Sequence, residues 1–161
     1  MLELRTQGIL NLETRIPAPV VAIAIAGIMK LYAHIAQISL DMFPVLVEAG
    51  TRLSQLSAAI AILAFASFAL AKTTINPLDP SRASTLVTGG IYRFTRNPMY
   101  LSLLLLLIAY AVRLGSWVEG LGPVVFAIYV TRFQIIPEER ILEAKFGAAF
   151  LAYKRRTRRW I

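Results

Sequence analysis

Cysteine is absent from the sequence, and histidine occurs once, as His34. Without cysteine the chain forms no disulfide and no thiolate metal site. One histidine does not supply a histidine-based metal cluster either. We therefore expect no bound metal.

Charged residues of either sign are scarce. They make up 16% of the 161 residues, whereas hydrophobic residues make up 57% and the mean hydropathy is +0.64. That composition is too apolar for an ordinary soluble domain. The 17 Lys and Arg exceed the 9 Asp and Glu, but long apolar stretches separate them, unlike the basic surface of a nucleic-acid-binding domain. We expect a membrane protein that binds no nucleic acid.

Four apolar segments approach the length that crosses a bilayer as a helix. They cover residues 16–38, 53–71, 98–112 and 120–136. The last two are short for a straight crossing, so their ends must extend into the flanking segments or the bilayer must thin there. The fold class that follows is an all-α integral membrane protein, folded as one domain over residues 1–161.

The segment that begins at Pro137 has the spacing of an amphipathic helix. Its apolar side chains fall on one side and its charges on the other, so we expect it to lie along the membrane interface. The first 15 residues mix both charge signs, unlike a signal peptide, and we expect the first apolar segment to be retained. We expect a short connection over residues 40–51.

One face of the first span carries polar residues. Lys30, His34 and Gln37 recur with Asp41 at helical spacing. Either this face lines a polar cavity, or Lys30 reaches the far interface while the others leave the membrane. We favour the second interpretation.

Basic residues are distributed unevenly along the chain. The N-terminus, the loop at 72–97 and the C-terminal segment carry most of them, whereas the two short connections carry only Arg52 and Arg113. By the positive-inside rule, the first three segments lie in the cytoplasm. The basic run at 154–159, followed by Trp160, is expected to bind anionic lipids of that leaflet.

Residues 85–100 combine a helix start with two arginines. Asn97 followed by Pro98 predicts the N-cap and first turn of the third span, and Arg93 and Arg96 come just before it. A helix N-terminus beside arginines suits an anion or carboxylate. Alternatively, the arginines pair with lipid head groups.

Two carboxylates, Glu138 and Glu139, follow Pro137 at the cytoplasmic end of the fourth span. Acidic residues in a first helical turn also stabilise the helix dipole, which is the structural alternative. Together with the arginines, however, they give the site an acidic and a cationic pole. Such a site suits a zwitterion, with the carboxylates on its ammonium or ribose hydroxyls and Arg96 on its carboxylate.

At these two places the sequence resembles the superfamily of isoprenylcysteine carboxyl methyltransferases and phospholipid methyltransferases. The first motif, L-V-T-x-G-x-Y-x-x-x-R-[HN]-P-x-Y, is filled by Leu86, Val87, Thr88, Gly90, Tyr92, Arg96, Asn97, Pro98 and Tyr100. The second, E-E-x-x-L followed by F-G-x-x-[YF]-x-x-Y, is filled by Glu138, Glu139, Leu142, Phe146, Gly147, Phe150 and Tyr153. The resemblance covers residues 72–160 and is closest to bacterial members, which implies a bacterial inner membrane.

The resemblance implies S-adenosylmethionine as the cofactor. The cofactor-binding residues that it implies, together with the arginine and carboxylates above, are Thr85, Leu86, Val87, Tyr92, Arg96, Asn97, Pro98, Met99, Tyr100, Glu138 and Glu139. Eukaryotic isoprenylcysteine enzymes have His in place of Asn97. They also have, in place of Gln134, an Arg associated with the acceptor carboxylate, for which Arg132 is the candidate substitute.

The expected function is methyl transfer to a lipophilic acceptor, isoprenylcysteine-like or another lipid, that enters from the bilayer. The protein's task is then alignment in a water-poor site. A carboxylate acceptor needs no general base, whereas an amine does, and Glu139 and Tyr100 are the candidates. One alternative is a phospholipid N-methyltransferase. Another, from a different class, is a non-catalytic transporter or assembly protein that uses the face of Lys30 and His34.

Overall fold

The computed structural model describes residues 16–38, 43–71 and 85–161, and every regular element in these ranges is helical. The predicted polar N-terminus and residues 72–84 of the predicted loop lie outside the described residues. The elements in chain order are α2 (Ala18–Ile35), α3 (Pro44–Leu70), the short 3-10 helix η2 (Gly90–Arg93), α4 (Pro98–Leu114), η3 (Trp117–Gly120), α5 (Leu121–Val130), the π-helical turn η4 (Thr131–Ile135), α6 (Ile136–Phe146) and α7 (Ala148–Arg156).

Proline marks the starts of the main helices. Pro44 and Pro98 are the first residues of α3 and α4, where a missing N–H costs no helical hydrogen bond. At the other end of α4, Gly115 takes the left-handed conformation (φ 68°) and its N–H bonds back to the last turn. The third predicted span is therefore confirmed at both ends.

Three helices are long and apolar enough to cross a membrane within the described residues: α2, α3 and the continuous helix from Trp117 to Phe146. The fourth apolar helix, α4, has 17 residues and so a length of about 26 Å, slightly less than the roughly 30 Å hydrocarbon core. Large apolar side chains on the outside of the bundle are exposed, for example Ile23 (72%), Val45 (79%) and Ile62 (67%). A surface of this kind is stable in lipid rather than water, so the protein is an integral membrane protein.

The second span is longer than predicted. Helix α3 starts at Pro44 rather than near residue 53, so most of the connection expected at 40–51 is helical. The reason is local: after Pro44 the segment is apolar, and Glu48 pairs with Arg52 one turn later, at 2.7 Å, which supports a helix.

The helix does not begin anew at Pro137. Instead α5, η4 and α6 follow one another without interruption, and the amphipathic segment splits into α6, which prolongs α5, and α7, which turns back after Gly147 (φ 50°). The π-helical turn directly before Pro137 loosens the helical hydrogen-bond ladder where this residue provides no N–H.

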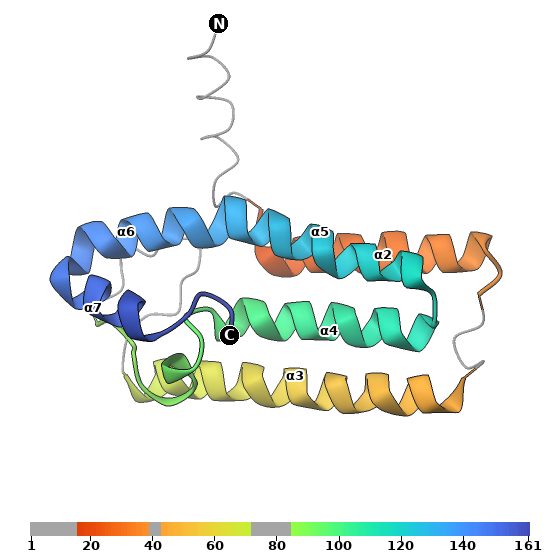
Figure 1. Ribbon diagram of the computed structural model, residues 1–161, viewed down its shortest axis with the longest axis horizontal. Coiled ribbons are helices and arrows are strands. Elements are labelled where there is room, and N and C mark those ends of the chain that lie inside the picture. Colours follow the sequence, from red (N-terminus) through yellow and green to blue (C-terminus); the bar gives the residue numbers. More distant parts are fainter. Residues whose placement is uncertain (1–15, 39–42, 72–84) are drawn as a thin grey trace, which may run out of the picture.

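In Figure 1, α4 is the middle layer, with α3 on one side and α2 and α5 on the other. The main core lies between α2, α4 and α5 and includes Phe126 and Val130, both fully buried. Between α3 and α4 the backbones approach closely, because a Cβ on Gly50 would lie 2.7 Å from the Ala109 carbonyl oxygen.

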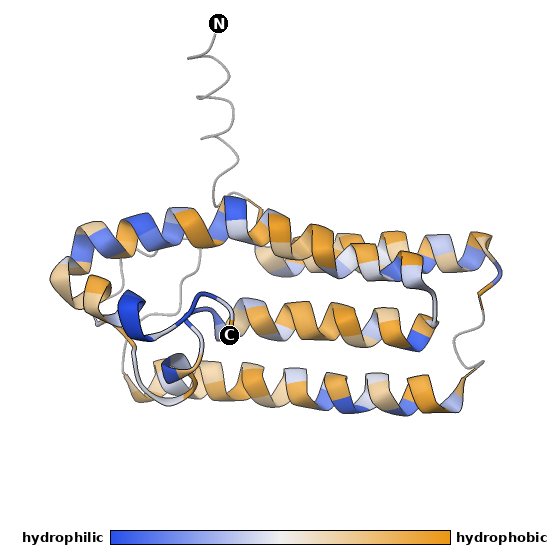
Figure 2. Ribbon diagram, viewed as in Figure 1, coloured by the Kyte–Doolittle hydropathy of each residue, from blue (hydrophilic) through white to orange (hydrophobic). Residues whose placement is uncertain are grey.

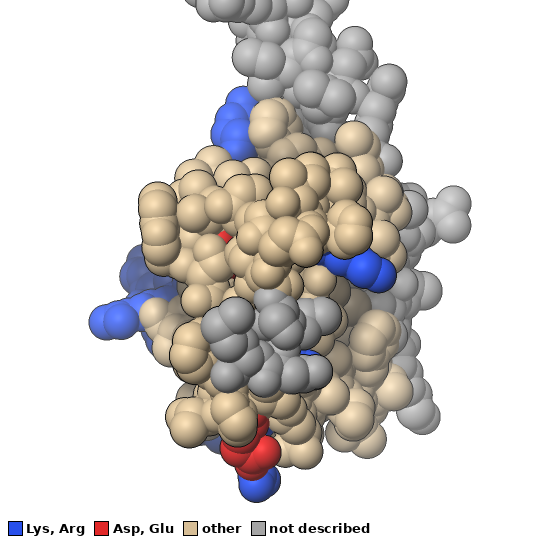
Figure 3. Space-filling model, turned by 90° about the vertical axis from the view of Figure 1, so that its right-hand side faces the viewer, with Lys and Arg blue, Asp and Glu red and all other residues tan. Residues whose placement is uncertain are grey.

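Charge is concentrated at one end of the molecule. Figure 2 shows hydrophilic residues along α6, α7 and the C-terminal segment, beside the start of α4. The opposite end, seen in Figure 3, presents mostly uncharged described residues with a few Lys and Arg and a small group of Asp or Glu at the bottom. This asymmetry places the polar chemistry at the end where α4 begins.

Candidate active site

Four segments meet at the start of α4. They are η2 with the residues up to Asn97, the first turn of α4, the first turn of α6, and residues 157–160, which we call the C-terminal strap. The strap follows α7 and brings the chain end beside α4 (Figure 1). It runs along the loop before α4, where the Arg96 backbone N–H donates to the Arg158 carbonyl at 3.0 Å.

Glu139 lies between two arginines. Arg96 Nη2 donates to its Oε1 at 2.7 Å, and Arg159 donates through Nη2 to Oε2 at 2.7 Å and through Nε to Oε1 at 3.2 Å. The side chains of Arg96 and Glu139 are each 9% exposed, and that of Arg159 is 35% exposed. The hydrogen bond to Glu139 raises the pKa of Arg159. Burial alone would raise the pKa of Glu139, but the bonds from Arg159 and Arg96 lower it, so the pair stays ionised.

Arg96 also binds backbone carbonyls at the end of α7 and in the strap. Its Nη1 donates to the carbonyls of Lys154 (3.1 Å) and Thr157 (2.5 Å). The sequence predicted opposite poles, with Arg96 for a ligand carboxylate and Glu139 for its ammonium. The structure instead joins these two residues to each other, so both are engaged by protein groups.

Glu138 lies next to this ion cluster but has a different partner. The Tyr100 hydroxyl donates to its Oε1, and Tyr100 is buried in the first turn of α4. Burial raises the pKa of Tyr92, and the electrostatic effects of Tyr153 and then of Glu138 raise it further. Tyr92 therefore stays a neutral phenol at physiological pH.

An apolar cluster supports these polar groups. Its buried members are Ala64, Tyr92, Phe150 and Tyr153, and the Tyr153 hydroxyl donates to the Tyr92 carbonyl at 2.7 Å. Phe68 of α3 meets Tyr92 edge to face, with ring centroids 5.4 Å apart. The predicted cofactor residues Leu86, Val87 and Met99 pack against the same cluster. Thr85 is exposed at its margin.

Asn97 and Pro98 occupy the predicted start of α4, but Asn97 does not cap it. Asn97 is in the N-cap position without a side-chain capping bond. Its Nδ2 donates to the Arg159 carbonyl at 2.9 Å instead. The helix start was predicted correctly, and the side-chain role was wrong: the amide group binds the strap through its Nδ2 instead of capping the helix through its Oδ1.

Gln134 and Arg132, the predicted acceptor-side residues, both lie in η4, directly before the first turn of α6. Gln134 is 1% exposed, and its Nε2 donates to the Ile16 carbonyl at 2.7 Å, just before α2. The Arg132 guanidinium lies 5.5 Å from the ring centroid of Phe133. Both residues belong to η4, and Gln134 joins the long helix to the beginning of α2.

Arg159, Tyr153 and Thr95 are site residues that sequence reasoning did not select. The run of six residues at 154–159 was expected to face lipid, and within such a run composition does not distinguish an inward arginine from an outward one. Tyr153 was visible only as a member of the second motif. Thr95, which is 2% exposed and donates to the Arg159 carbonyl at 3.3 Å, gave no signal.

Comparison with known proteins connects this geometry to a family. A family model described as phospholipid methyltransferase matches residues 45–149, a range that contains Tyr92, the start of α4 and both carboxylates but not the strap. The chain is also 46% identical over 63 residues to an uncharacterized protein of Haemophilus influenzae. That stretch is 39% of this chain and the whole of the relative. No solved structure matches.

Proposed function

Because the match extends over residues 45–149, the chain belongs to the phospholipid methyltransferase family and is a membrane methyltransferase, and we propose that it transfers the methyl group of S-adenosylmethionine to a lipophilic acceptor. The observation that supports this proposal best is the Tyr100–Glu138 pair beside the Tyr92 cluster. It combines an apolar wall, a carboxylate and a helix start in one place.

The residues fit the two ends of this cofactor. Leu86, Val87 and Met99 provide apolar surface for the adenine. The Glu138 carboxylate suits ribose hydroxyls or the ammonium, and the start of α4 suits the carboxylate. Since Arg96 and Glu139 bind each other, we assign them to holding the site together.

S-adenosylmethionine supplies a methyl group that its sulfonium already activates, and the electron pair of the broken carbon–sulfur bond stays on sulfur. The chain's residues then align the acceptor and exclude water. If the acceptor is an amine, it must lose a proton, and we assign this task to the Tyr100–Glu138 pair rather than to Glu139, because both Glu139 oxygens accept bonds from arginines.

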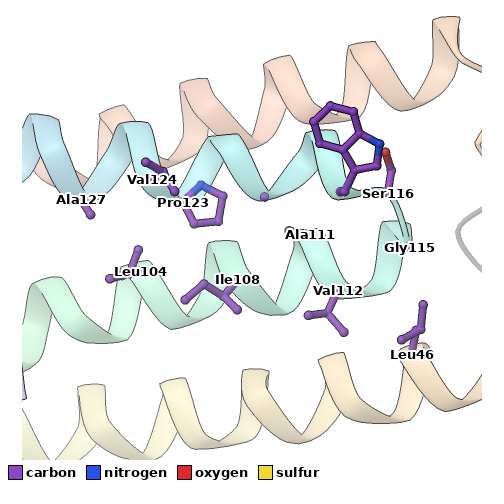
Figure 4. A pocket seen from close by; sticks show the side chains of 12 residues that line it. Leu46, Leu104, Ile108, Ala111, Val112, Gly115, Ser116, Pro123, Val124 and Ala127 are labelled. Atoms are coloured by element: carbon purple, nitrogen blue, oxygen red, sulfur yellow. The ribbon is translucent and has the colours of Figure 1, made fainter.

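An apolar groove of about 570 Å³ supports a lipophilic acceptor (Figure 4). Its lining includes Leu104, Ile108 and Ala111 of α4 together with Pro123 and Val124 of α5. Residues 104, 108 and 111 follow Tyr100 at steps of four, four and three, so they share its face of α4. The groove extends from Leu104, one turn beyond Tyr100, to the turn at Gly115, Ser116 and Trp117. A hydrocarbon chain whose polar end lies at the Leu104 end would direct that end toward Tyr100.

We also propose that the charged end of the molecule lies on the cytoplasmic side of a bacterial inner membrane. Arg155 and Arg156 are exposed at the end of α7, where they are placed to bind anionic lipids. Lys30 and His34 are exposed on α2 and do not line the apolar groove, so these described residues do not favour the non-catalytic alternative.

Calorimetry with the purified protein in detergent tests cofactor binding. We expect the wild type to bind S-adenosylmethionine, and Glu138→Ala and Asn97→Ala to bind about tenfold more weakly, since each removes a hydrogen-bonding group of the site. Arg158→Ala, an exposed neighbour in the strap, is the matched control. A folded wild-type protein without affinity for the cofactor would refute the proposal.

A labelling experiment distinguishes the classes of methyl acceptor. The protein is incubated with methyl-labelled S-adenosylmethionine and with phosphatidylethanolamine, an isoprenylcysteine or total lipid extract, and the labelled product is identified. Label in the phosphatidylethanolamine head group would favour the phospholipid N-methyltransferase. Label in the isoprenylcysteine would favour a carboxyl methyltransferase.

A further inference from the structure

The C-terminal strap lies outside the family match at 45–149. Its residue Arg159 nevertheless binds several groups of the site, through both its side chain and its backbone. Two nitrogens of its side chain bind Glu139, at 2.7 and 3.2 Å. Its backbone carbonyl accepts from Asn97 Nδ2 at 2.9 Å and from Thr95 Oγ1 at 3.3 Å. One residue is thus bound by α6 through its side chain and by the start of α4 through its backbone.

The same two elements carry the Tyr100–Glu138 pair. Glu138 precedes Glu139 in the first turn of α6, and Tyr100 follows Asn97 by three residues, one helical turn, in α4. The positions of the two members of the pair therefore depend on how the elements are held relative to each other. We propose that Arg159 is a positioning residue that joins α4 to α6 across the site and thereby sets the distance between Tyr100 and Glu138.

Burial and charge distinguish this role from lipid anchoring. Arg158, the preceding residue, is exposed, whereas the Arg159 side chain is 35% exposed and directed to a carboxylate that is 9% exposed. Arg96 alone already neutralises Glu139, through its contact at 2.7 Å. A second arginine is therefore not required for charge balance, and its geometric effect is to fix the strap.

The rest of the strap depends on this anchor. Thr157 is 5% exposed, its carbonyl accepts from Arg96 and its Oγ1 donates to the Arg93 carbonyl at 3.5 Å. Trp160 packs against the main core. If the Arg159 side chain is lost, the backbone bonds of the strap and Trp160 remain. We then expect residues 157–160 to open from the loop more often and α4 to shift relative to α6.

The absence of native cysteine provides a direct assay. A single Thr157→Cys reports strap docking through its rate of maleimide labelling, and a single Ser102→Cys, at a 6% exposed position in α4, reports the fold. We expect Arg159→Gln to raise labelling at position 157 at least tenfold and to weaken S-adenosylmethionine binding about tenfold. Arg159→Lys keeps the charge without the two-pronged contact and should fall between Arg159→Gln and wild type, while Arg158→Gln stays within about twofold of wild type.

This role rests on the proposed function, and the two measurements separate the failures. Equal labelling in Arg159→Gln and Arg158→Gln would overturn the bridge itself. Faster labelling with unchanged cofactor affinity would overturn the positioning role. A wild-type protein with a docked strap but no affinity for the cofactor would overturn the proposed function and with it the effect on binding, whereas the labelling result on the bridge would stand. If Ser102→Cys also becomes reactive in Arg159→Gln, the variant has lost its fold, and the comparison of Arg159→Lys with wild type decides.

Discussion

Removing the Glu139 carboxylate should destabilise the whole charged end of the protein. In Glu139→Ala, Arg96 loses its 2.7 Å carboxylate contact and Arg159 loses contacts at 2.7 and 3.2 Å. The Arg96 side chain is 9% exposed, so its charge becomes buried without a counter-charge.

The size of the effect follows from burial. Removing one partner of a buried pair costs about 3–5 kcal/mol. Arg96 keeps its bonds to the carbonyls of Lys154 and Thr157, and Arg159, at 35% exposed, regains water, so we expect the lower end, about 3 kcal/mol. The unfolding equilibrium constant would then rise about 100-fold.

Reversible unfolding in mixed detergent, followed by circular dichroism, measures this change. The matched control is Glu48→Ala, which removes a 2.7 Å ion pair of one helical turn whose side chains are 61% and 74% exposed; such a pair contributes about 0.5 kcal/mol or less. If the two variants lose stability equally, within about 0.5 kcal/mol, Glu139 is not the buried centre of an ion cluster and the reasoning fails.

Four further substitutions test other parts of the structure. Tyr100→Phe removes the hydroxyl that donates to Glu138. It should weaken S-adenosylmethionine binding about tenfold, measured by calorimetry, and change the unfolding midpoint by no more than a few degrees. Unchanged affinity would show that Tyr100 does not contribute to cofactor binding. Gly50→Ala places a Cβ 2.7 Å from the Ala109 carbonyl oxygen and should destabilise by about 2 kcal/mol, whereas Gly27→Ala, with no atom within 4 Å, should stabilise α2 by up to about 1 kcal/mol. Gln134→Leu loses a buried hydrogen bond of 2.7 Å to the Ile16 carbonyl before α2. The free energy of unfolding should fall by about 2 kcal/mol in the same assay, with cofactor affinity unchanged. A loss of affinity without a loss of stability would show that Gln134 acts in the active site.

The helices could largely be predicted from sequence, because hydropathy and proline placement act locally. Pro98 fixed the start of α4, and Gly115 lies in the turn that was expected after it. The early start of α3 was missed because residues 44–52 contain charges and a proline that also suit a loop. The short fourth span was expected either to extend into its flanking segments or to require a thinner bilayer, and the helix does extend through Pro137. The π-helical turn before Pro137 was not predicted.

The residues near the site were predictable as a set, whereas their pairings were not. Helix starts and motif spacing brought Arg96, Asn97, Tyr100 and both carboxylates together. Which carboxylate meets an arginine and which meets a tyrosine depends on the rotation of α6 relative to α4, and no local pattern reports this rotation. The docking of Arg159 depends in the same way on the turn after α7.

The π-helical turn at Thr131–Ile135 changes the direction that the side chains of one long helix face between its two halves. An α-helix advances about 100° per residue, so an extra residue in one turn offsets everything beyond it by a comparable angle. Before the turn, Phe126 and Val130 point to the core, and beyond it the paired carboxylates face the start of α4. Deletion of one residue within the turn would remove this offset, rotate the two halves relative to each other and separate a well-packed bundle from a working site.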